Sequence, residues 1–134
     1  MTASHELVNP DGLAAPAGYT HVVVAAPGRL VFVAGQIASD ADGVCRGETI
    51  AEQLELALQN VAGALGAVGG APEHAVAIQI YTTDVEAYRT ERREIGERYR
   101  TVFGRHYPAM SLFEVTRLYD PAALVEIVCT AVIP

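Results

Sequence analysis

The sequence contains no lysine and no tryptophan, and only two cysteines among its 134 residues. Without a lysine amine, the chain cannot form a Schiff base with a carbonyl substrate or with pyridoxal phosphate. A phosphate-binding loop of the Walker type is excluded for the same reason, because its lysine is missing. No other motif in the chain calls for a cofactor, and we expect none.

The chain also lacks long apolar runs and clusters of metal ligands. No run approaches the ~20 apolar residues that cross a bilayer, and the N-terminus lacks the basic-then-apolar plan of a signal peptide. We therefore expect a cytoplasmic protein with no membrane partner. Disulfides are unusual in that compartment, so Cys45 and Cys129 should be free thiols. Their spacing matches no zinc motif, and we expect no metal.

Basic residues are outnumbered by acidic ones, and the formal net charge is −7 at pH 7. Binding to nucleic acid depends on lysine and arginine, so we expect no nucleic-acid partner. Most of the arginines lie between Arg89 and Arg117, but neighbouring glutamates offset them. Glu94 and Arg98 have the favourable i,i+4 order on a helix. We interpret this run as a solvated helix face rather than a basic patch.

The length is that of one domain, residues 1–134, and its first half begins with an irregular lead-in. Two apolar runs, 19–26 and 30–36, flank Pro27-Gly28. This pair favours a type II turn, so we predict a hairpin. Farther on, Thr49 and Glu52 have the spacing of a capping box. Apolar residues then recur at helical spacing up to Val68, which predicts a helix.

The second half continues the alternation of strands and helices. We predict a strand at 75–83, a helix at 85–103, and two strands at 110–118 and 123–133. The order ββαβαββ favours an α+β fold with two helices on one face of a mixed sheet. Several strands carry apolar residues at both odd and even positions, which face opposite sides of the sheet. The second sheet face is therefore not polar. Another copy of the chain is the simplest cover for it.

One acid lies inside the last apolar strand. Leu124, Glu126 and Val128 share a face there, because strand side chains alternate. An ionised carboxylate on an apolar surface is costly unless it is paired or hydrogen-bonded. Glu126 is therefore either a catalytic or ligand-facing acid, or a structural acid. In the structural case its partner would be Arg117 across a hairpin or an arginine of a neighbouring subunit.

Several motifs, in order along nearly the whole chain, resemble the reactive intermediate deaminase family, also called RidA or YjgF-like. Each motif is weak alone, but together they are specific. The motifs that carry the resemblance are Gly18-Tyr19-Thr20-His21, Val33-Ala34-Gly35-Gln36-Ile37, the helix from Glu52 to Asn60, Pro108-Ala109 and Leu124-Val125-Glu126-Ile127.

The resemblance implies a chorismate-mutase-like fold and a homotrimer with small-molecule sites in the clefts between subunits. The family's deaminases hydrolyse reactive enamine and imine acids to keto acids and ammonia. On this basis Glu126 would be the catalytic residue, handling the proton or positioning the water. Tyr19 would close the pocket, and the backbone N–H of Gly35 would hold a ligand oxygen.

One position departs from the family pattern. After Pro-Ala the deaminases have an arginine, whose guanidinium binds the substrate carboxylate bidentately, whereas this chain has Met110. Ala34 and Gly96 also depart, from a serine and an asparagine. Met110 and Leu112 would then line the pocket. The resemblance thus implies a ligand that is less acidic or held differently, and poor activity on simple 2-imino acids.

Three functions stay open on this reading. The chain is a hydrolase of an imine, an enamine or a related metabolite, or an enzyme with a different reaction on the same scaffold. Alternatively, it is a non-catalytic ligand-binding or interaction protein, which the missing arginine supports. His21 is a further base in principle, but a lone histidine at a strand start is more often polar surface.

Overall fold

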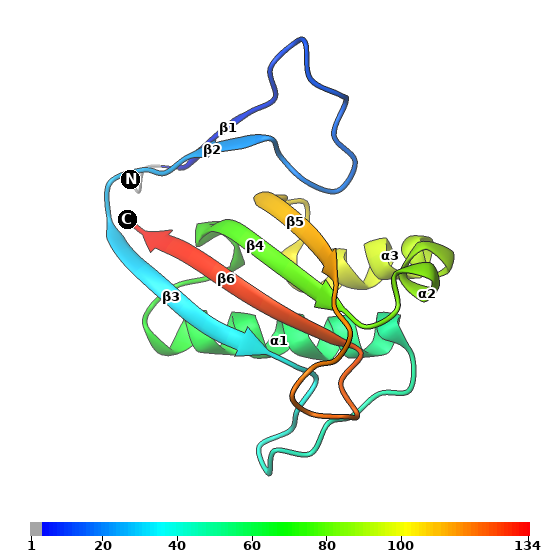
Figure 1. Cartoon of the computed structure of the whole chain (residues 1–134). Coiled ribbons are helices and arrows are strands. Elements are labelled where there is room, and N and C mark those ends of the chain that lie inside the picture. Colours follow the sequence, from blue (N-terminus) through cyan, green and yellow to red (C-terminus); the bar gives the residue numbers. More distant parts are fainter. Residues whose placement is uncertain (1–3) are drawn as a thin grey trace.

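Four strands form a mixed sheet, and the helices cover one of its faces (Figure 1). This computed structural model describes residues 4–134. The sheet order is β3-β6-β4-β5, in which β4 and β5 are parallel and the other neighbours are antiparallel. The strands of this sheet are β3 (Arg29–Gln36), β4 (Ala75–Thr82), β5 (Ala109–Glu114) and β6 (Val125–Ile133). The predicted α+β class is confirmed.

The longest helix, α1 (Ile50–Ala67), supplies most of the core. Its start is capped as predicted, since the Thr49 hydroxyl accepts the Glu52 N–H at 3.2 Å. The Glu52 carboxylate reaches back one residue beyond the cap and accepts the Glu48 N–H at 2.8 Å. The apolar stripe of α1 is fully buried against the sheet: its members include Leu54, Leu58, Val61 and Leu65.

The second predicted helix, over 85–103, is wrong as a single element. The structure divides it into α2 (Val85–Thr90) and α3 (Arg92–Phe103), with the break at Glu91. The Glu91 carboxylate accepts the N–H of Ala51 at 3.1 Å, so it caps the first turn of α1. This is a tertiary contact between helices, and local spacing could not reveal it.

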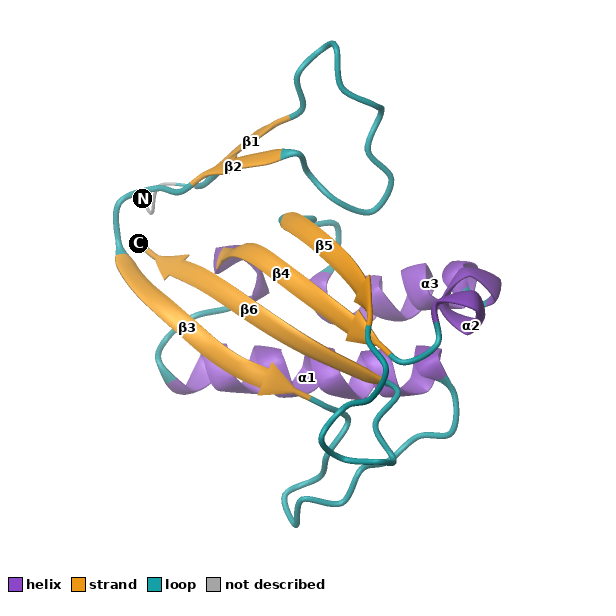
Figure 2. Ribbon diagram, viewed as in Figure 1, coloured by secondary structure: helices purple, strands orange, loops and turns teal. Residues whose placement is uncertain are grey.

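The predicted hairpin between the first two apolar runs is also wrong. β2 (Val22–Val24) pairs with β1 (Glu6–Val8), a strand in the lead-in that we expected to be irregular. These two strands form a separate two-stranded ribbon (Figure 2). β3 pairs with β6 instead, and Gly28 passes the end of β6. A Cβ built on Gly28 would lie only 2.4 Å from the backbone oxygen of Ile133.

The last two strands are not neighbours, because β4 lies between β5 and β6. The predicted hairpin of these two strands does not form, so Arg117 cannot pair with Glu126 across it. The face of the sheet opposite the helices, which we call the open face, carries apolar side chains. Phe32 is 75% exposed there and Phe113 46% exposed. No helix described within residues 4–134 is both long and apolar enough to span a membrane.

Candidate functional site

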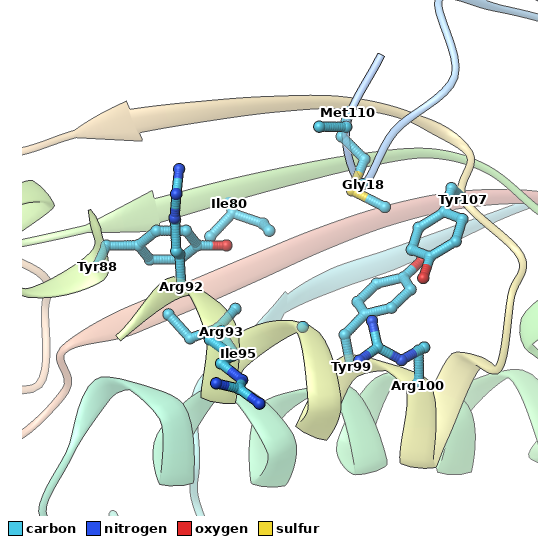
Figure 3. Close-up of a pocket in the computed structure, with 12 residues that line it drawn as sticks. Gly18, Ile80, Tyr88, Arg92, Arg93, Ile95, Tyr99, Arg100, Tyr107 and Met110 are labelled. Carbon is cyan, nitrogen blue, oxygen red and sulfur yellow. The ribbon is translucent and has the colours of Figure 1, made fainter. Parts of the chain in front are cut away.

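A cavity of about 470 Å³ lies on the helix side of β4 and β5, and we call it the α3 cavity. The start of the chain closes one side through Gly18, and Met110 faces the helices across the space (Figure 3). Its lining residues are Ala17, Gly18, Ile80, Tyr88, Arg92, Arg93, Ile95, Gly96, Tyr99, Arg100, Tyr107 and Met110. A cavity of this size is typical of small-molecule sites.

The charge of this lining is one-sided, because three arginines of α3 contribute to it and no carboxylate does. Arg93 lies 3.6 Å from Glu97, and both side chains are well exposed. Within residues 4–134, neither Arg92 nor Arg100 has an ion pair or a side-chain hydrogen bond in the structure. The α3 cavity is therefore electropositive within a protein of net charge −7.

Three tyrosines shape the same cavity. Burial raises the pKa of Tyr88 to about 12, so its hydroxyl stays protonated at neutral pH. Tyr99 donates its hydroxyl proton to the His106 carbonyl at 2.6 Å, and burial raises its pKa further. The rings of Tyr99 and Tyr107 stack, with centroids 5.2 Å apart. The rings of Tyr99 and Tyr107 are thus fixed by stacking and by the Tyr99 hydrogen bond.

A smaller cavity of about 260 Å³ lies beside the first, and it brings Tyr19 and His21 close to Met110. The lead-in is held there by Thr20, whose N–H donates to the Pro108 carbonyl at 3.1 Å and whose hydroxyl donates to the Tyr107 carbonyl. His21 Nε2 lies 2.6 Å from the Ala14 carbonyl, so this histidine is engaged in holding the lead-in.

Glu126 and Gly35 meet on the open face. A Cβ built on Gly35 would lie 2.8 Å from Cδ and Oε2 of Glu126, so only glycine leaves the carboxylate its present position. Gly35 belongs to a β-bulge, since the register between β3 and β6 shifts between Val33 and Gln36. A bulge leaves a residue out of the ladder of hydrogen bonds between the two strands.

Two side-chain amides of α1 hold the chain just before this acid and just after the bulged strand; Gln53 is buried and Asn60 half-buried. The Gln53 side chain donates to the Ala122 carbonyl at 3.0 Å and accepts the Leu124 N–H at 2.8 Å, just before β6. The Asn60 side chain donates to the carbonyls of Ile37 and Ser39 at 2.9 Å, just after β3. Helix α1 therefore positions the two strand ends that carry Glu126 and Gly35.

The structure places Met110 and Glu126 on opposite faces of the sheet. Met110 lines the α3 cavity, Tyr19 lines only the smaller cavity, and Gly35 and Glu126 adjoin each other on the open face. Leu112 lines neither cavity and is 41% exposed. Within residues 4–134, no group of three histidines, cysteines or carboxylates is arranged to hold a metal.

Sequence reasoning missed the arginines of the α3 cavity. We interpreted their run as a solvated face, and Arg89, Arg92 and Arg100 are exposed as predicted, whereas Arg98 is half-buried. What we did not predict is the cavity that Arg92 and Arg100 adjoin. A signal was present in Gly96, because a glycine inside a helix is unfavourable by about 1 kcal/mol relative to alanine. That cost suggests a need for space at this point of α3.

The fold and these two clusters define a class of small α+β proteins in which helices cover one sheet face and the other face stays open. The model of the family described as Endoribonuclease L-PSP matches residues 10–133. The chain belongs to this family, whose members are also called RidA or YjgF-like, and the resemblance noted above is confirmed.

Individual relatives agree with this assignment. The RutC family protein UK114 of Drosophila melanogaster is 32% identical, over 97% of this chain and 91% of the relative. The crystal structure of YyfB, a Rid-family protein of unknown function from Yersinia pestis, superposes with a TM-score of 0.86 at 26% identity, over 98% of this chain and all of that one. A YjgF/YER057c/UK114-family structure from Mycobacterium tuberculosis has a TM-score of 0.64 at 36% identity, covering 87% of each chain.

Proposed function

We propose that this protein is a homotrimer whose small-molecule sites form between subunits. The observation that carries this is the separation of the two clusters. Met110 lies on the helix side of the sheet, whereas Glu126 lies on the open face. One chain cannot bring them onto one ligand, but the open face of one copy can meet the cavity of the next. The exposed Phe32 and Phe113 support such an assembly.

The chemistry that we propose is hydrolysis of an imine or enamine. Water adds to the imine carbon, a proton moves to nitrogen, and loss of ammonia leaves a carbonyl compound. Glu126 accepts and returns the proton or positions the water, as a carboxylate without an ion pair among residues 4–134 is free to do. The N–H of Gly35, next to that carboxylate, holds a ligand oxygen.

The test is a coupled assay of keto-acid formation from imines generated enzymatically from serine or threonine. Wild-type protein at a few micromolar should barely exceed spontaneous hydrolysis, because Met110 offers no donor to the carboxylate. Met110→Arg should raise the rate, and adding Glu126→Gln should abolish the gain. Because Ala34 and Gly96 also differ from the deaminase pattern, the gain is expected to be partial. Strong wild-type acceleration would contradict this assignment of the pocket.

A non-catalytic ligand-binding role is the second candidate, and Met110 is the observation that favours it. The two roles separate in a thermal-shift screen against a metabolite panel, followed by turnover assays on every hit. A bound ligand stabilises the folded state by mass action, whatever chemistry follows. A ligand that binds tightly and is recovered unchanged would favour the binding role.

The family description refers to a ribonuclease, and this chain offers little support for that activity. RNA binding depends on a broad basic surface, and the net charge here is −7. Three of its nine arginines line one cavity, and the others are spread along the chain. We therefore propose a small molecule rather than RNA as the ligand.

A further inference from the structure

We propose that Arg100, with Arg92, binds the carboxylate of a small organic acid in the α3 cavity. Anion recognition then comes from helix α3 and not from strand position 110. This inference rests on the proposed function in one respect, since it takes the α3 cavity as part of the ligand site.

The Arg100 guanidinium lies beside the backbone of Gly96, one helical turn before it. A Cβ built on Gly96 would lie 3.4 Å from Nη1 of Arg100, at the close limit of ordinary van der Waals contact. Both residues line the α3 cavity, and at position 96 no side chain stands between the guanidinium and the helix backbone.

The neighbouring arginines of helix α3 differ in their partners. Arg98 is held by the carboxylates of Glu94 and Glu55, each at 2.9 Å. Arg92 and Arg100 line the α3 cavity, which has no carboxylate in its lining. A guanidinium with no internal partner beside a cavity is free to form the bidentate pair with a ligand carboxylate.

The rest of the lining describes the body of such an acid. Ile80 and Met110 of the sheet and Ile95 of α3 give the cavity an apolar surface, and the stacked ring of Tyr107 continues it. The Tyr88 hydroxyl, which has no hydrogen-bond partner among residues 4–134, is the remaining neutral donor (Figure 3). The matching ligand has an apolar or aromatic body and one acidic end.

This arrangement also defines which acids fit. An arginine at position 110 would bring its charge from the sheet, whereas Arg100 brings it from the helix layer opposite. The carboxylate is therefore held away from the sheet. Acids whose carboxylate is several atoms from the reacting carbon fit better than simple 2-imino acids.

The test compares matched carboxylate and carboxamide pairs, which differ in charge but hardly in shape: benzoate with benzamide, phenylacetate with phenylacetamide, and hexanoate with hexanamide. Binding is followed by ¹H–¹⁵N spectra at low salt, with the Gly96 amide as reporter. In wild-type protein at least one acid should bind roughly tenfold more tightly than its amide. Arg100→Gln should remove most of that preference, and Arg100→Lys should retain part of it.

Arg89→Gln is the matched control, because Arg89 pairs with Glu86 on α2 and does not line the α3 cavity. This variant should keep the wild-type preference. Equal binding of acids and amides by wild-type protein would overturn the proposal. An equal loss in Arg89→Gln and Arg100→Gln, or no binding of any acid near α3, would overturn it too.

Glu126→Gln separates this inference from the proposed function. It should keep a preference for acids over amides, because the Arg100 guanidinium is unchanged and the charge removed is that of a carboxylate, which can only oppose anion binding. A clear preference without any turnover would overturn hydrolysis while sustaining anion binding. Turnover that depends on Glu126 without any preference for acids would do the opposite.

Discussion

The two faces of the four-stranded sheet differ in how complete they are within one chain. On the helix side, the core residues of α1 and β6 are almost entirely inaccessible: Leu58, Val61, Val125 and Ile127 have no exposed area. On the open face, Leu30 and Phe32 are 60% and 75% exposed, although they belong to the neighbouring strand. Within one chain, the sheet is thus covered on the helix side and uncovered on the open face.

The stability of a single chain therefore depends mainly on one face of the sheet. Burial of apolar area drives folding, and the helix side supplies nearly all of it. Glu126 and Gly35 lie on the face that contributes little to the fold of a single chain. Within one chain the open face therefore stays uncovered, whereas the helix side is constrained by packing.

The largest effect is expected from breaking the helix side. Leu58→Ala removes a side chain with no exposed area from the centre of α1, and should lower the free energy of unfolding by about 3 kcal/mol. Urea denaturation at one fixed protein concentration measures this. Leu13→Ala, at a position 54% exposed, is the control and should change stability by less than about 0.5 kcal/mol. Equal losses in the two variants would contradict the comparison.

The next effect tests the open face. Wild-type protein should elute as a trimer in size exclusion with light scattering. Phe32→Asp should shift it toward the mass of one chain, 14.2 kDa, because a buried charge at the contact is unpaired. Val68→Asp changes an apolar residue that is 43% exposed at the end of α1, and should leave the trimer intact. A monomeric wild-type protein would refute the proposed assembly.

Local patterns predicted the helix side well, and tertiary contacts explain the failures. The cap at Thr49 and the buried stripe of α1 follow from spacing within a few residues. The break at Glu91 exists because its carboxylate serves another helix. The place of β5 beside β4 depends on which strands meet across the whole chain, and local sequence does not encode that choice.

The site was predicted in part, for a similar reason. The resemblance indicated Glu126 and Gly35, and the structure brings these two together. The sequence could not show that the sheet lies between these two residues and Met110. The cavity was not predicted because Arg92 and Arg100 are exposed, as the sequence indicated, and only the structure shows that they adjoin it, whereas Arg98 pairs with Glu55.

A substitution at Gly35, with a smaller effect on stability, tests the role of the open face. Gly35→Ala places a methyl group 2.8 Å from the Glu126 carboxylate, whose flexible end can move away. The backbone of Gly35 has no positive φ, so the stability loss should stay below about 1 kcal/mol. Hydrolysis by the Met110→Arg protein should nevertheless fall roughly tenfold, because catalytic groups tolerate little displacement.

The matched control for this variant is Gly63→Ala on helix α1. A Cβ there meets nothing within 4 Å, and alanine should raise stability by about 0.5–1 kcal/mol with no change in hydrolysis. Thermal melts and the keto-acid assay on both variants complete the test. Full activity in Gly35→Ala would show that the position of the Glu126 carboxylate is unimportant.

The smallest effect on stability is expected from treatment of the two thiols, one in the core and one near the surface. Cys129 is buried in β6, where burial raises the pKa of its thiol to about 12, and Cys45 is a half-buried free thiol. Because the thiolate is the reacting form, Cys129 should resist Ellman's reagent at pH 8 until the protein unfolds, whereas Cys45 reacts slowly in the folded state. Reduction should leave the melting temperature unchanged. A mass gain of two hydrogens on reduction, with a large loss of stability, would instead reveal a disulfide and contradict the free-thiol assignment.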